Sequence, residues 1–283
     1  MQGEKLSAKF HFLLKTSLCI LWRKKMWPLI KKELKENLTK FIIMFLVMLG
    51  TAFFLIPYGY NMVSQIPGEL FNNPAVPGWL RNQLNAMLPN LKYIDFFIFS
   101  QWFGKNLLQF AIFFSIIMSI GTIAGETERK SSIFLFSRPV KRKTILLSKV
   151  IVVFSFLIIS IVIPTYLLPV LSNSIPLNIN MHLLNIGLLY AVIGTLATAA
   201  ISIFFSTLIN DRLKATFAAF AVIIITIPMA SIKGMHWINI VNLYVSTKFF
   251  QTGMIYFPPL ICGIGIIIFF LAASYYILKK KEF

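Results

Sequence analysis

The chain has 283 residues, of which 58% are hydrophobic and only 13% are charged, and its mean hydropathy is +0.79. Soluble domains average about 45–50% apolar and about 25% charged residues, so a soluble globular domain is excluded. The formal net charge is +18, which in a soluble protein would suggest a nucleic-acid partner. Here the Lys and Arg residues lie at the ends of apolar runs and not along an aromatic-rich basic stripe, so nucleic acid is not the expected partner.

Residues 1–25 are expected to form an N-terminal extension. Their apolar stretch at 10–22 is short and interrupted by Lys15, and no small-residue cleavage site follows it, so it does not have the form of a secretory signal. A second possible start of the chain lies at Met26.

The stretch after Met26 predicts an amphipathic helix that lies in the membrane interface and leads into the first span. Its apolar stripe has helical spacing and consists of Trp27, Ile30, Leu34, Leu38 and Phe41. The charged residues assigned to the opposite face are Lys31, Lys32, Glu33, Lys35 and Glu36.

Runs of about 20 apolar residues are long enough to cross a bilayer as helices. The sequence contains six such runs, which predict an all-α integral membrane protein with six transmembrane helices. The expected spans are about 41–59, 106–125, 150–171, 183–207, 216–232 and 256–278.

The basic residues indicate the orientation of these spans. With both termini inside, 22 of the 27 Lys and Arg residues fall on the inner side of the membrane. This excess is typical of cytoplasmic segments, so we expect a multi-pass protein of the cell (inner or plasma) membrane with cytoplasmic N and C termini. All nine acidic residues are expected outside the spans, which disfavours an ion- or proton-coupled carrier.

Three smaller features bear on packing. The first outer loop, about 60–104, carries a helical stripe at Leu80, Leu84, Met87, Leu88 and Leu91, which predicts a helix on the outer leaflet. The apolar loop 236–253 predicts short helices shielded by the protein. Small residues in the fourth span, Gly187, Ala191, Gly194 and Thr198, predict close helix packing, within this subunit or between two copies.

The segment 121–149 is the most informative for function. Gly125 is expected to end the second span, and the polar run 126–129 and the apolar residues Phe134 and Phe136 follow it. Pro139 disfavours helix at the preceding residue and predicts a turn. A short helix with apolar anchors and a charged rim is suited to docking into a groove of a partner protein.

This segment resembles the first cytoplasmic loop of the permease subunits of type-2 ABC exporters (ABC-2 type transporter membrane proteins). The elements of that family's loop fall on Gly125, Glu126, Arg129, Ser137, Arg138, Pro139, Arg142 and Lys149, while Lys130 stands where the family usually has a glycine. The resemblance implies that residues 26–283 form a six-span permease domain. It implies that the ATPase coupling loop contains Glu126, Glu128, Arg129, Phe134, Phe136, Arg138, Pro139, Arg142 and Lys149.

The resemblance also implies partners. Such permeases assemble with two cytoplasmic ABC ATPase subunits and with a second permease copy or a related permease, surrounded by membrane lipid. The chain has no GxxxxGK[ST] phosphate loop, so it is expected to bind no cofactor and to be no enzyme itself. The alternative function is a non-transporting membrane scaffold or immunity protein. The sequence shows no set of catalytic residues that a membrane-embedded enzyme would need. No spacing of cysteine or histidine residues predicts a metal site.

Overall fold

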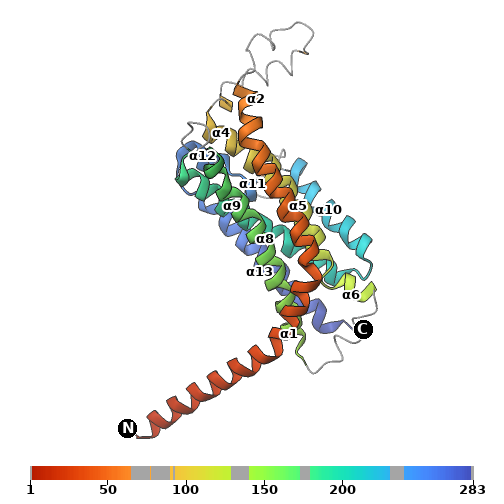
Figure 1. Cartoon of the computed structure of the whole chain (residues 1–283). Helices are drawn as coiled ribbons and strands as arrows, with labels where there is room; N and C mark the ends of the chain where they lie inside the picture. Colours follow the sequence, from red (N-terminus) through yellow and green to blue (C-terminus); the bar gives the residue numbers. More distant parts are fainter. Residues whose placement is uncertain are drawn as a thin grey trace.

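The computed structural model describes residues 2–64, 77, 90–91, 93–128, 140–172, 179–229 and 239–281, with the backbone alone for residues 2–25, 64, 247 and 251. These residues are predominantly helical and contain no strand. A helix pairs its own backbone N–H and C=O groups, which is what a lipid environment demands. The long helices lie side by side in one bundle, and the N-terminal part of α1 projects away from it (Figure 1).

The described elements follow one another along the chain, with the longest gap between α2 and α4. In order they are α1 (Gln2–Phe54), the π-helical segment η1 (Leu55–Tyr60), α2 (Asn61–Ser64), α4 (Ile94–Phe97), the π-helical segment η3 (Ile98–Leu107), α5 (Leu108–Ile120), α6 (Ala124–Glu128), α8 (Arg142–Ser172), α9 (Met181–Leu208), α10 (Arg212–Met229), α11 (Val241–Tyr244), α12 (Thr247–Thr252) and α13 (Phe257–Lys280).

Several of these helices are long and apolar enough to cross a membrane, which confirms the prediction of an all-α multi-pass protein. Within the described residues, five stretches qualify: Met26–Val63, Ile94–Ile120, Arg142–Ser172, Met181–Leu208 and Phe257–Lys280. They correspond to the first, second, third, fourth and sixth expected spans. Helix α10 coincides with the fifth, but it is not among the five; the expected span runs to 232, beyond the last described residue of this helix.

Helix α9 is the centre of the bundle and contacts α5, α8, α10, α11 and α13. Its most apolar stretch is 67% buried, against 17% in α13, whose exposed apolar side chains are left to face lipid. Its small residues explain how so many neighbours fit. A Cβ on Gly187 would lie 2.8 Å from the ring of Phe103, and one on Gly194 would lie 2.7 Å from the ring of Tyr244. The small-residue face therefore packs within the subunit.

Helix α1 runs without interruption from the predicted interfacial stretch into the first span, and it packs along α8. The predicted stripe does not coincide with its buried face: Trp27 is 62% exposed and Leu38 is 45% exposed. The buried positions lie to one side of that stripe, at a spacing of mostly four residues. They are Leu29, Glu33, Asn37, Met44, Met48 and Ala52.

The loop after α10 contains the predicted short helices. Helices α11 and α12 bury Leu243, Tyr244 and Phe249. The Tyr244 hydroxyl lies 2.8 Å from Thr198 Oγ1 and forms a hydrogen bond with it. Because Thr198 lies well inside α9, α11 reaches into the bundle. The predicted outer-leaflet stripe, Leu91 excepted, lies outside the described residues.

The bundle has two distinct ends. At one end, which we call the charged end, the Arg142 guanidinium donates to the carbonyl oxygens of Leu278 (2.7 Å) and Lys281 (2.6 Å), so α8 begins where α13 finishes. At the other end, which we call the far end, the Tyr190 hydroxyl donates to the Tyr256 carbonyl (2.6 Å), so α13 begins near the start of α9.

Gly194→Ala tests the packing of α9. The new methyl group has no room beside the Tyr244 ring, and overpacking of this kind costs about 1–3 kcal/mol. We expect a lower thermal-unfolding midpoint in detergent for this variant. Gly265→Ala in α13 is the matched control, because nothing lies within 4 Å of its Cβ position. Equal midpoints for the two variants would contradict the packing described.

A buried charge cluster at the candidate coupling site

The second span ends in a sharp turn that is held by a serine from another helix. Helix α5 has Gly121 as its C-cap, and Gly125 lies inside α6, so the expected helix end at Gly125 is wrong. The Ser206 hydroxyl of α9 accepts hydrogen bonds from the N–H groups of Ile123 and Ala124, both at 3.0 Å, and donates to the Ile120 carbonyl at 2.7 Å. These bonds pair backbone groups that the break in the helix leaves without partners.

The turn places Glu126 beside a lysine and a second glutamate that come from two other helices. The Lys149 ammonium of α8 lies 2.5 Å from Glu33 Oε1 of α1 and 3.1 Å from Glu126 Oε1 of α6. Lys32 Nζ lies 2.9 Å from the same oxygen of Glu126. We call Lys32, Glu33, Glu126 and Lys149 the charge cluster. It joins α1, α6 and α8 at the charged end of the bundle.

Three of the four charges in the cluster are removed from solvent. The exposed fractions of the side chains are 2% for Lys149, 5% for Glu33 and 7% for Glu126. Burying an ion costs several kcal/mol, which is recovered only when opposite charges and hydrogen bonds replace its hydration. Here two cations face two anions, so the formal charge of the cluster is balanced. Removing Lys149 would leave two buried carboxylates facing the single, partly exposed ammonium of Lys32.

A polar cavity of about 270 Å³ adjoins the charge cluster. Its lining carries as many acidic as basic side chains, and it consists of Lys32, Glu33, Glu36, Asn37, Lys40, Gly121, Gly125, Glu126 and Arg212. The carboxylate oxygens of Glu33, Glu36 and Glu126 lie within 4.8 Å of one another, as in a cation site. Each of these three carboxylates already has an ammonium partner, because Lys149 contacts Glu33 and Glu126, and Lys32 contacts Glu126 and Glu36.

The residues that the sequence assigns to the coupling loop divide into three groups. Glu126 and Lys149 meet in the charge cluster, and their side chains are buried. Arg142 binds the last carbonyl groups of α13, and Glu128 is exposed at the end of α6. The remaining members lie outside the described residues, so their roles stay predictions: Arg129, Phe134, Phe136, Arg138 and Pro139.

Sequence reasoning missed two members of the cluster, Lys32 and Glu33, together with Ser206. Glu33 was placed on the solvent side of an interfacial helix, whereas its side chain lies on the buried face of α1, where it contacts Lys149. A signal was available: Glu33 lies four residues after Leu29 and 11 before Met44, on the same helical face.

Partial burial also affects the end of α13. The Lys281 ammonium donates to the Thr207 carbonyl at 2.7 Å, which ties the end of α13 to the end of α9. Desolvation by this burial lowers the pKa of Lys281.

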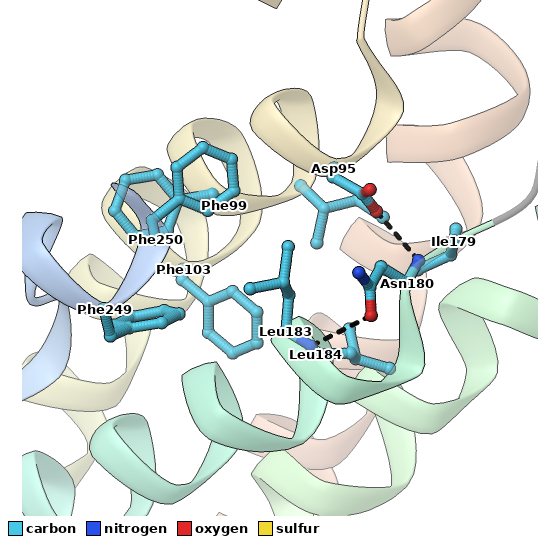
Figure 2. Close-up of a pocket in the computed structure, with 10 residues that line it drawn as sticks. Asp95, Phe99, Phe103, Ile179, Asn180, Leu183, Leu184, Phe249 and Phe250 are labelled. Atoms are coloured by element: carbon cyan, nitrogen blue, oxygen red, sulfur yellow. Dashed lines mark hydrogen bonds between the residues drawn. The ribbon is translucent and has the colours of Figure 1, made fainter. Parts of the chain in front are cut away.

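The far end contains a small concavity that does not have the properties of a binding site (Figure 2). Its volume is about 10 Å³, which is about the minimum for one water molecule. Asp95 accepts a hydrogen bond from the Asn180 N–H at 2.9 Å, and the Asn180 side chain caps the start of α9. The rings of Phe99 and Phe250 stack with their centroids 4.4 Å apart. This concavity is a packed junction of α4, η3, α9 and α12.

The comparisons with known proteins address the whole bundle. The family model for ABC-2 family transporter proteins matches residues 27–283. A comparison with curated protein sequences finds no match. The family match covers every element of the site, from the charged stretch of α1 to the end of α13.

Lys149→Met tests the charge cluster. The change leaves two buried carboxylates with only Lys32 as a counter-charge, and breaking a buried ion pair typically costs about 3–5 kcal/mol. We expect the free energy of unfolding in detergent to fall by about that amount. Adding Glu33→Gln removes one of the two carboxylates and should restore part of the loss.

Lys214→Met is the control for this experiment, because Lys214 is an exposed lysine at the charged end of the bundle. If Lys149→Met were as stable as Lys214→Met, the cluster would not hold the three helices together.

Proposed function

Because the chain belongs to the ABC-2 family of transporter proteins, whose members are membrane-embedded transport components, we propose that it is the permease subunit of an ATP-driven exporter. Separate cytoplasmic ABC ATPase subunits supply the energy, and a second permease copy or a related permease completes the pathway. The observation that carries this proposal is the family match from residue 27 to residue 283. The resemblance found in the segment 125–149 is confirmed at the level of the family.

The charge cluster suggests how the coupling loop acts. Residues 129–139 contact the ATPase, and Glu126 and Lys149, whose side chains are buried, act within the permease. Movement of the loop is passed to α1 and α8 through the ion pairs and to α9 through Ser206. A rigid connection of this kind converts the approach of two ATPase subunits into movement of whole helices.

The contacts at the two ends support six spans and a common side for the loop and the C terminus. Arg142 at the start of α8 binds carbonyls at the end of α13, so the chain returns to the same end between these residues. Three crossings by α8, α9 and α13 would finish at the opposite end. Helix α10 supplies the fourth, because Arg212 lines the cavity at the charged end. The excess of basic residues supports a cytoplasmic location for this end.

Reporter fusions test this topology. Fusions after Lys130 and after Lys281 should report a cytoplasmic position, and fusions near Asn73 and after Lys233 should report an external one. The fusion at Lys233 decides between five and six spans, because this residue follows α10. A cytoplasmic reading there would contradict the crossing by α10, and one at Asn73 would contradict the first two spans.

The coupling loop is tested by two substitutions with matched controls. Phe134→Ala removes an apolar anchor, and truncating an anchor that fills a partner pocket typically costs more than about 2 kcal/mol of binding. We expect it to reduce co-purification of the ATPase much more than Lys141→Ala does, because charges at the rim of an interface contribute less. Glu126→Gln should leave assembly intact and reduce substrate-stimulated ATP hydrolysis, whereas Glu128→Gln, at an exposed position, should not.

The measurement pairs ATPase capture with ATP hydrolysis for each variant. Wild-type capture and hydrolysis for both Phe134→Ala and Glu126→Gln would show that the loop has no coupling role. Failure of the wild-type chain to capture any ABC ATPase would favour the alternative of a non-transporting membrane scaffold.

A further inference from the structure

An apolar groove with a basic rim lies between α8 and α13 near the charged end. The groove has a volume of about 250 Å³, and its lining is apolar apart from Lys143 and the Tyr275 hydroxyl group. The lining residues are Lys143, Leu146, Leu147, Val150, Leu271, Ala272 and Tyr275. Between Lys143 and Val150 the groove extends about 10 Å along α8, at a rise of 1.5 Å per residue.

Lysines continue both walls of the groove toward the end of the bundle. Lys143 precedes Leu147 by one helical turn on α8, and Lys279 follows Tyr275 by one turn on α13. The Arg142 contacts with the carbonyls of Leu278 and Lys279 hold these two helix ends together. The apolar walls and the charged end of the groove are therefore adjacent.

Lys143, Lys279 and Lys280 are exposed, and we call them the basic rim. None of the ion pairs found among the described residues includes them. The Lys280 ammonium lies 4.5 Å from the centroid of the Tyr276 ring, which keeps this charge at the level of an aromatic residue typical of the membrane interface. The rim thus concentrates positive charge beside an aromatic side chain of the kind found at membrane interfaces.

We propose that this groove binds an anionic phospholipid, with an acyl chain between α8 and α13 and the phosphate against the basic rim. Basic pockets between transmembrane helices suit anionic headgroups, and apolar walls below them suit the chain. Both walls belong to candidate membrane spans, so lipid reaches the groove directly. The site is separate from the charge cluster and does not depend on the exporter role.

Two other occupants fit the groove less well. A symmetric contact with a second copy would bring two basic rims together, and juxtaposed like charges are unfavourable. A soluble protein could approach the rim, but it would not enter a groove whose walls lie in the hydrocarbon region.

Native mass spectrometry of the detergent-purified chain tests the proposal with two lipids of equal chain composition, palmitoyl-oleoyl phosphatidylglycerol and phosphatidylcholine. We expect the wild type to bind the anionic lipid at least about fivefold more tightly, as a lysine near an anionic headgroup provides about this factor. The triple substitution Lys143→Gln, Lys279→Gln and Lys280→Gln should remove the preference. Ala272→Trp should fill the groove at an exposed position and reduce the binding of both lipids.

Controls separate the rim and the groove from general effects. Lys214→Gln removes an exposed lysine elsewhere at the charged end, and Ala221→Trp places a large ring on an exposed face of α10. Both controls should bind lipid as the wild type does. Glycerophosphoglycerol, the headgroup without chains, should not compete. Equal binding of the two lipids by the wild type, unchanged binding by Ala272→Trp, or full competition by the free headgroup would each overturn the proposal.

Discussion

An ammonium group can be buried only where other charges replace its hydration, and Lys149 shows what this requirement imposes on the bundle. Its two carboxylate partners come from different elements, Glu33 from α1 and Glu126 from α6. Helices α1, α6 and α8 must therefore meet at this point, because otherwise the cost of burying these charges is not recovered. The ion pairs, together with apolar contacts such as the stacked rings of Phe41 and Phe156, fix the register of α1 against α8.

Other contacts at the charged end of the bundle adjoin the charge cluster. Ser206 anchors the turn that presents Glu126, and the polar cavity opens beside it with a balanced set of charges. About two helical turns before Lys149, Arg142 binds the end of α13, so α8 connects the charge cluster to the C-terminal helix. The groove between α8 and α13 follows from this arrangement. Arg142 holds the two helix ends together, and the groove lies between the two helices next to this contact.

The sequence predicted the spans well because hydropathy reports transfer into lipid, a property of each segment alone. It also identified Glu126 and Lys149 as belonging to one loop. It could not predict that they meet Glu33, because that contact joins residues 116 positions apart and turns an apparent surface charge into an interior one. The end of α5 was missed for a related reason: Gly125 is a plausible local stop, but the actual stop depends on a hydroxyl from α9. The local sequence was enough to predict that these helices exist, whereas the end of α5 depends on a side chain that is distant in the sequence.

The Ser206 bonds have a consequence for measuring movement in this protein. The Ser206 hydroxyl oxygen bonds backbone groups on both sides of the turn. The ends of α5 and α9 are therefore held next to each other, although they lie more than 80 residues apart in the chain. While these bonds hold, a displacement of one helix end carries the other with it. A pair of spectroscopic probes near Ile120 and Ser206 would thus provide an internal ruler of constant length, against which changes elsewhere in the bundle can be calibrated.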